Sequence, residues 1–120
     1  MTAVENPATV SGSVRVANEV IASIAAMAAR EIDGVADLDE QAAHQFGDWL
    51  RRRDTAHQGV RVDVDGDKRL HLRVFLRARR GVLFSEVAEL VQTNVVEAVE
   101  RMLGLEVAAV DVLVASVDFD

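Results

Sequence analysis

The clearest pattern in the chain is an alternation of apolar and other residues from position 70 to position 79. Leucine, valine and alanine occupy the even positions, whereas histidine, arginine and Phe75 occupy the odd ones. Such an alternation is typical of a strand with one buried face. A helical spacing of apolar residues follows from about residue 84 to residue 103, and Gly104 ends it before a valine-rich run at residues 107–117. The pattern therefore predicts a strand, a long helix and a second strand.

A shorter unit with the same outline precedes this one. Residues 14–16 read as a brief strand, and Asn18 is placed to cap a helix whose apolar face extends to Ile32. Asp33-Gly34 ends that helix before a short strand at residues 35–38. In the later unit Ser85 takes the capping position. The two units share an outline and not residue identities, so the repeat is weak.

A hairpin is predicted between residues 60 and 76. The apolar residues of both strands, among them Val60 and Leu70, stand at even positions. A two-residue turn at Asp65-Gly66 would pair even with odd positions and set valine opposite arginine. We therefore expect a three-residue loop, residues 66–68, or a bulge.

These elements together predict an α+β fold. A helix between consecutive strands normally returns the chain for parallel pairing. Two such units and one hairpin predict a two-layer sandwich, in which a mixed sheet of four to five strands carries two helices on one face. We expect a single domain at residues 12–120, a flexible lead-in at residues 1–11, and a mobile loop at residues 39–58, which is polar and broken by Gly47.

In this fold the second face of the sheet is uncovered. It would present arginines from the central strand beside Phe75, together with Leu113, Val117 and Phe119 from the last strand. A monomer rarely exposes such a surface, so we expect it to contact a partner or another copy of the chain. The residues of this candidate interaction surface are Arg73, Phe75, Arg77, Arg79, Leu113, Phe119 and, from the loop, Trp49.

Composition and charge narrow the function. The 120 residues contain no cysteine, which excludes disulfides and thiolate metal sites. We expect a soluble protein, because no apolar run approaches the roughly 20 residues of a membrane span and no signal peptide is recognisable. The net charge is −7, yet residues 51–80 carry +6 and the remainder −13. This asymmetry suits association between copies or with a charged partner, and an ordinary solvated surface explains it equally well.

Signatures of catalysis and metal binding are weak. The run from Asp63 to Asp67 is similar to part of a calcium loop, but its glycine comes two positions early and its twelfth position is Val74. The histidines lack the spacing of a zinc site, and the glycines form no phosphate loop. We expect no enzyme activity, no metal and no cofactor.

Two other binding modes stay open. The arginine-rich strand is similar to a sheet that contacts phosphates and stacks bases, but Phe75 is its only aromatic residue and the acidic remainder of the chain repels polyanions. Nucleic acid is therefore the less favoured alternative. The segment Phe46–Arg53 places Trp49 beside three arginines, which suits an anionic membrane surface. We favour a Trp49 that folds back onto the domain, because so short a patch binds membranes weakly.

A family resemblance covers about residues 12–119. It is carried by Val14–Ile21 with Ala28–Val35, by Val87–Gln92, by Val95–Val99 followed by Glu100–Val107, and by Val110–Val114. These runs resemble the alkaline shock protein (Gls-type) envelope stress response family of bacteria. The resemblance implies a non-enzymatic cytoplasmic scaffold, peripheral to the inner face of the cell membrane. It also implies self-association into a homo-oligomer and recruitment by a membrane-anchored protein or a family paralogue.

Overall fold

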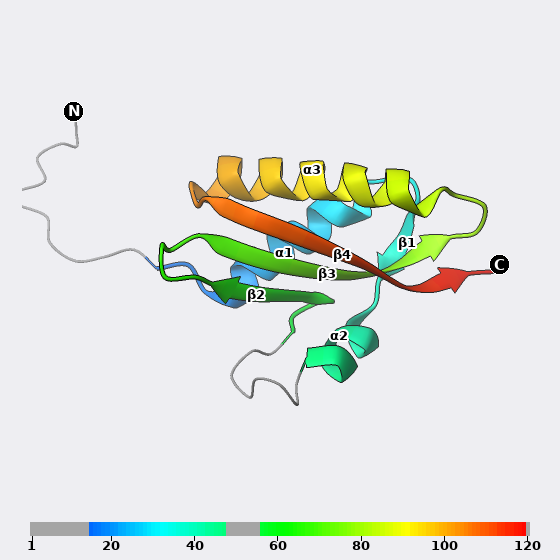
Figure 1. Ribbon diagram of the computed structural model, residues 1–120, viewed down its shortest axis with the longest axis horizontal. Coiled ribbons are helices and arrows are strands. Elements are labelled where there is room, and N and C mark those ends of the chain that lie inside the picture. Colours follow the sequence, from blue (N-terminus) through cyan, green and yellow to red (C-terminus); the bar gives the residue numbers. More distant parts are fainter. Residues whose placement is uncertain (1–14, 48–55, 120) are drawn as a thin grey trace, which may run out of the picture.

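The computed structural model describes residues 15–47 and 56–119, which form three helices and four strands (Figure 1). In chain order the elements are α1 (Asn18–Arg30), β1 (Val35–Leu38), α2 (Glu40–Gly47), β2 (Val60–Val64), β3 (Leu70–Arg79), α3 (Phe84–Leu103) and β4 (Val107–Asp118).

Every other strand pairs with β3. β4 runs parallel to β3 along its whole length, whereas β2 and β1 are antiparallel to it, β2 at residues 70–74 and β1 at residues 76–78. A strand has only two hydrogen-bonding edges, so β1 and β2 share the edge opposite β4. The predicted α+β fold with a mixed sheet is confirmed, with four strands.

The register of the hairpin is also as predicted. Val60 lies opposite Val74, and Val64 lies opposite Leu70, so apolar residues face each other across the two strands. The N–H of Asp65 donates to the carbonyl of Arg69 at 3.0 Å, which leaves a loop of residues 66–68. Lys68 takes a φ of 65°, the left-handed conformation that closes such three-residue loops.

One face of the sheet carries α1 and α3, and the main core lies beneath them. The even positions of β3 point into this core, as the alternation predicts. α3 buries a stripe of valines, and α1 packs closely because most of its buried positions are alanines. Gly34 allows a close contact at the end of α1, because a Cβ there would collide with the side chain of Val87.

Three predictions about the first unit and the caps are wrong. Residues 15–17 form no strand, because two or three extended residues without a partner edge do not make one; Val14 lies outside the described residues. β1 is antiparallel to β3, so the first unit contains no parallel pair. Asn18 and Ser85 lie inside the first turns of α1 and α3, and the N-cap residues are Ala17 and Leu83, neither of which makes a side-chain capping bond.

The segment predicted as a loop contains α2, which covers part of the second face of the sheet. The Asp39 carboxylate accepts a hydrogen bond from the N–H of Ala42 at 2.9 Å and so caps this helix. Ala42 and Ala43 are buried against the sheet. The two-layer prediction therefore holds for α1 and α3, and α2 begins a third layer. No helix in the described ranges is long and apolar enough to cross a membrane.

Gly59 lies where three strands meet. Its carbonyl accepts the N–H of Phe75 at 2.9 Å, and the carbonyl of Phe75 accepts the N–H of Asp39 at 2.7 Å. Gly59 has a φ of 85°, and a Cβ on it would lie 2.8 Å from the Cβ of Leu38. Only glycine fits this position without strain.

We expect Gly59→Ala to lower the free energy of unfolding by about 2–4 kcal/mol, because it adds an unfavourable φ and an overpacked contact. Urea denaturation followed by circular dichroism measures the change. Gly66→Ala is the matched control, since no atom lies within 4 Å of its would-be Cβ and its φ is not positive. Equal midpoints for the two variants would show that Gly59 is not a constrained junction.

The hairpin loop should make stability depend on pH through Asp65. The pKa of its carboxyl is lowered to about 2, first by the N–H of Arg69 and then by the ring of His71, whose Nε2 lies 2.8 Å from Oδ2. A folded-state pKa below the ordinary 3.8 stabilises the protein above that value, and the contribution is lost as pH falls through about 2.

We therefore expect Asp65→Asn to reduce stability at neutral pH, and we expect its difference from wild type to shrink as pH falls through about 2, where the folded carboxyl takes up its proton. Urea denaturation at a series of pH values gives the difference. A gap between the two proteins that is the same at every pH would contradict this role of the Asp65 carboxylate.

Candidate interaction surface

The candidate interaction surface predicted from the sequence lies on the face of the sheet opposite α1 and α3. The odd positions of β3 point to this face, but α2 covers its middle (Figure 1). Phe75 is fully buried there, in a small cluster with Ala42, Ala43 and Ala56. The prediction that Phe75 is exposed is therefore wrong, because the segment read as a loop supplies a helix that covers it.

Arg61 of β2 lies under the same helix, and the charge pattern gave no sign of this. Its side chain is buried, and its Nη1 lies 3.4 Å from the carbonyl oxygen of Ala43 in α2. The guanidinium thus contributes to the contact between α2 and the sheet rather than to a surface patch. Burial of one arginine out of the basic segment could not be read from the sequence.

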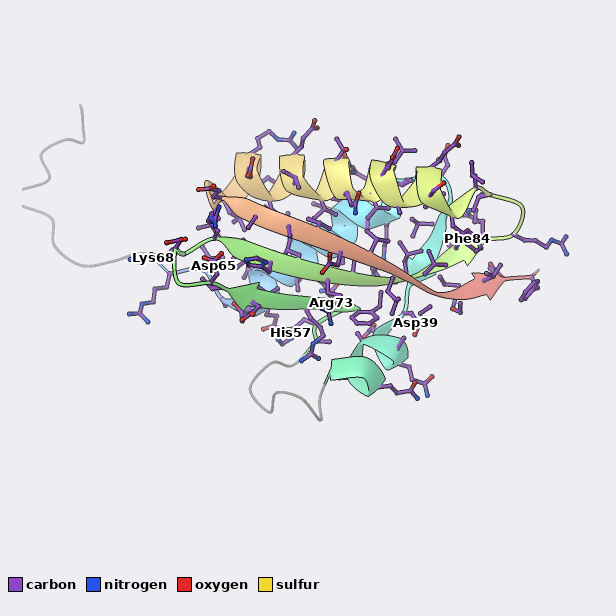
Figure 2. The ribbon with its side chains drawn as sticks, in the orientation of Figure 1. Asp39, His57, Asp65, Lys68, Arg73 and Phe84 are labelled. Carbon is purple, nitrogen blue, oxygen red and sulfur yellow. The ribbon has the colours of Figure 1, made fainter. Side chains whose placement is uncertain are left out.

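Arg73 and Arg77 differ in environment. Arg73 is exposed (Figure 2). Its Nη2 is 4.0 Å from the carboxylate of Asp111 on β4. Arg77 is half-buried and lies opposite Asp37 of β1. The pKa of Asp37 is lowered, chiefly by a hydrogen bond from Arg30 at 3.0 Å, and Arg77 adds to the effect.

Arg79 binds the backbone of another element. Its Nε donates to the carbonyl oxygen of Asp33 at 2.8 Å, which joins the end of β3 to the turn after α1. Arg73 and Arg79 therefore each have an oxygen acceptor within the domain, whereas the buried Nε of Arg77 has no hydrogen-bond partner among the described residues. This local matching accounts for part of the basic charge that the sequence concentrates in residues 51–80.

The apolar residues of β4 are divided between the two faces. Leu113 lies opposite Phe75 and is 39% exposed. The register shifts between Val114 and Ser116, so that Val117 lies opposite Ala78 of the main core. The predicted row of Leu113, Val117 and Phe119 on one face is therefore wrong, because a bulge reverses the alternation. Phe119 follows the strand and is 71% exposed; Trp49 lies outside the described residues.

β4 forms an open edge of the sheet, which the alternation of side chains between the two faces does not reveal. Within the described ranges β4 pairs only with β3. The N–H of Leu70 donates to the carbonyl of Glu106, which means that the backbone groups of Val107 point away from β3. Two side chains of α3 bind this edge: Glu100 accepts the N–H of Val107 at 3.0 Å, and Gln92 donates to the carbonyl of Val110 at 3.1 Å.

Past Val110 the edge is no longer capped. The pairing with β3 is regular from Val110 to Val114, so the backbone groups of Val112 and Val114 point the same way as those of Val110. The described part of the chain supplies no partner for them. Figure 1 shows the reason, since β4 diverges from α3 toward its C-terminal end. Ser116 holds this half of the strand in place, because its hydroxyl lies 3.1 Å from the carboxylate of Asp39.

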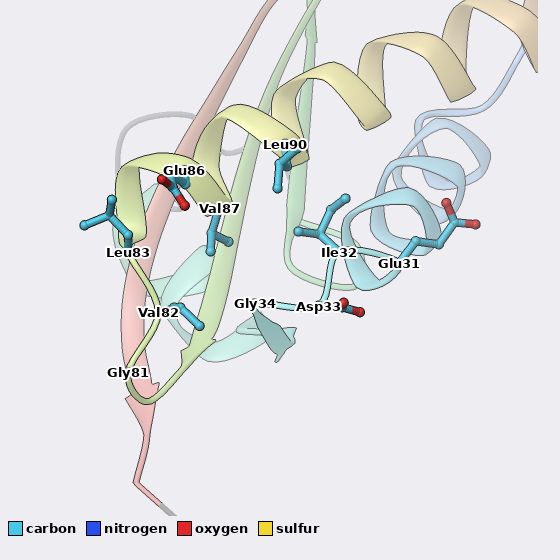
Figure 3. A pocket seen from close by; sticks show the side chains of 10 residues that line it. All are labelled: Glu31, Ile32, Asp33, Gly34, Gly81, Val82, Leu83, Glu86, Val87 and Leu90. Atoms are coloured by element: carbon cyan, nitrogen blue, oxygen red, sulfur yellow. The ribbon is translucent and has the colours of Figure 1, made fainter.

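A cavity of about 620 Å³ lies between the end of α1 and the start of α3 (Figure 3). Ile32, Val82 and Leu90 are among its apolar lining residues, and the carboxylates of Glu31 and Asp33 point outward at its rim. No group of three histidine, aspartate or glutamate side chains that could hold a metal ion occurs in the residues that the structure describes. The cavity offers apolar contact and no recognisable catalytic arrangement.

Comparison with known proteins identifies the same family that the sequence resembles. Residues 6–119 match the alkaline shock protein (Gls-type) family, which is described by a cell envelope-related function. The chain is similar to two proteins of Bacillus subtilis (strain 168). YloU is 32% identical over 109 residues, 88% of each chain, and YqhY is 31% identical over 113 residues, 91% of this chain and 79% of the relative. No solved structure matches.

The position of Phe75 leads to a prediction about stability. We expect Phe75→Ala to lower the free energy of unfolding by about 3–5 kcal/mol, because it empties a buried site between the sheet and α2. Leu113→Ala, on the neighbouring strand but partly exposed, is the control and should cost clearly less. Chemical denaturation compares the two variants, and a small cost for Phe75→Ala would mean that α2 does not cover this residue in solution.

Proposed function

Because the chain belongs to the alkaline shock protein family, which has a cell envelope-related function, we propose that it is a non-enzymatic envelope stress response scaffold. In this proposal it associates with other copies of itself. It is recruited to the inner face of the cell membrane by a membrane-anchored protein partner.

The observation that carries the proposal is the uncapped part of the β4 edge. Strand edges with free backbone groups readily pair with other strands, and monomeric proteins usually protect them with charges, prolines or covering elements. β4 has no proline and no basic residue, and Asp111 is the only charge inside the strand before Asp118. Leu113 adds exposed apolar surface within this segment, and Phe119 adds more just beyond the end of the strand. Such a surface suits an assembly contact.

Recruitment through a protein fits the charge of the chain better than direct adsorption to lipid. The net charge is −7, and the cytoplasmic leaflet carries anionic lipids that repel a negative protein. Acidic residues are frequent on the outer side of α3, where Glu86, Glu89 and Glu97 are exposed. An anchored partner removes the need for the scaffold itself to bind lipid.

The alternative of nucleic-acid binding through β3 receives less support from the geometry. Phe75 is buried beneath α2 and is not available to stack on a base. Arg77 is half-buried and Arg79 donates to a backbone carbonyl, so Arg73 is the exposed arginine at the centre of the strand, and Asp111 lies 4.0 Å from it. Sensitivity of complexes to nuclease distinguishes this alternative in the experiment below.

We expect the purified protein to sediment with native membrane vesicles of a bacterium that expresses it, and not with protein-free vesicles of phosphatidylglycerol and phosphatidylethanolamine. Protease treatment of the native vesicles beforehand should abolish binding, because the partner is a protein. Nuclease treatment should have no effect.

The salt dependence of binding to protein-free vesicles separates direct adsorption to lipid from binding to a protein partner. Binding to the protein-free vesicles that weakens with salt would indicate direct adsorption and contradict recruitment. Retention that depends on nucleic acid would favour the alternative function. Failure to sediment with untreated native membranes would also refute the recruitment proposal.

A further inference from the structure

We propose that the uncapped part of β4, residues 111–115, pairs antiparallel with the same segment of a second copy about a two-fold axis at Leu113. The pairing would join two four-stranded sheets into one continuous sheet. The inference rests on the proposed function insofar as it names the surface through which the scaffold associates with itself.

The direction of the backbone groups sets which residues can bond across the axis. Val112 and Val114 direct their N–H and C=O groups to the open edge, whereas Asp111 and Leu113 direct theirs to β3. In an antiparallel pair the outward-directed residues must lie opposite each other. With the axis at Leu113, Val112 lies opposite the partner's Val114, and the two exchange reciprocal hydrogen bonds.

The side chains fit this register. Leu113 lies directly opposite the partner's Leu113, with Cβ atoms about 5 Å apart, so two exposed apolar side chains cover each other. Asp111 lies opposite the partner's Ala115, and the two aspartates are therefore not placed side by side. A register centred on Val112 would instead use Val110, whose carbonyl is already bound by Gln92.

The ends of the proposed pairing coincide with features of the strand. On one side Gln92 and Glu100 of α3 occupy the edge as far as Val110. On the other side the bulge between Val114 and Ser116 interrupts the regular ladder. The free segment is thus short and bounded on both sides, so the same segments of two copies can pair over their whole length. A self-complementary segment of this kind favours a closed two-fold dimer.

The test uses opposite charges at residue 113 in the full chain. Leu113→Lys and Leu113→Glu each place like charges opposite each other across the axis, and each should weaken self-association by about tenfold or more. An equimolar mixture of the two variants should restore a species of twice the 13.1 kDa chain mass, because lysine then lies opposite glutamate. Analytical ultracentrifugation over a range of concentrations measures the masses.

Met102→Lys is the matched control, since Met102 is an apolar residue, 52% exposed, that belongs to α3 and not to the proposed segment 111–115. It should associate as the wild type does, and circular dichroism should show the same fold for all variants. Wild-type protein that is monomeric at every concentration would overturn the inference. Association that persists in both single variants, or a mixture that does not restore the dimer, would also overturn it.

The outcome is independent of membrane recruitment. A monomeric Leu113→Lys variant that still sediments with native membranes would leave recruitment intact and support β4 as the self-association site. If the Leu113→Lys and Leu113→Glu variants each associate as strongly as the wild type, β4 pairing is refuted, and self-association must use another surface.

Discussion

The structure depends on the pairing of β3 with all other strands of the sheet. β3 is long enough for β2 and β1 to share one of its edges while β4 occupies the other. The backbone of Phe75 connects the two halves of the shared edge, since its N–H is bound by Gly59 and its carbonyl by Asp39. Asp39 also caps α2 and contacts Ser116 of β4. One short segment therefore positions the third layer and the free end of the sheet.

The sequence predicted the parts of the fold that follow from local pattern. The alternation of residues 70–79 identified β3 and its buried face, and the even parity of the valines in both hairpin strands was sufficient to predict the loop at residues 66–68. α2 was missed because a short polar helix has too few apolar positions for a clear period. Its start depends on Asp39, whose capping role is recognisable only when the following residues are known to be helical.

The candidate surface was harder to predict, because an alternation assigns residues to a face without showing what covers that face. Phe75 was placed on the correct side of the sheet and is nevertheless buried. The bulge before Ser116 then reversed the assignment of Val117. The order of strands at an edge depends on long-range pairing, so the free edge of β4 could not be derived from its valine-rich sequence. What the sequence indicated correctly is that the C-terminal region carries exposed apolar residues: Leu113 is exposed within β4, and Phe119 is exposed directly after it.

If two copies of the chain pair through the edge of β4, amide hydrogen exchange should show protection at the residues that form the new hydrogen bonds. The amides of Asp111 and Leu113 point toward β3 and should be protected in dilute and in concentrated protein. The amides of Val112 and Val114 point to the open edge and should exchange rapidly in dilute protein. We predict that these two amides become protected as the protein concentration rises. Exchange at Val112 and Val114 that does not change while the protein associates would contradict pairing through β4.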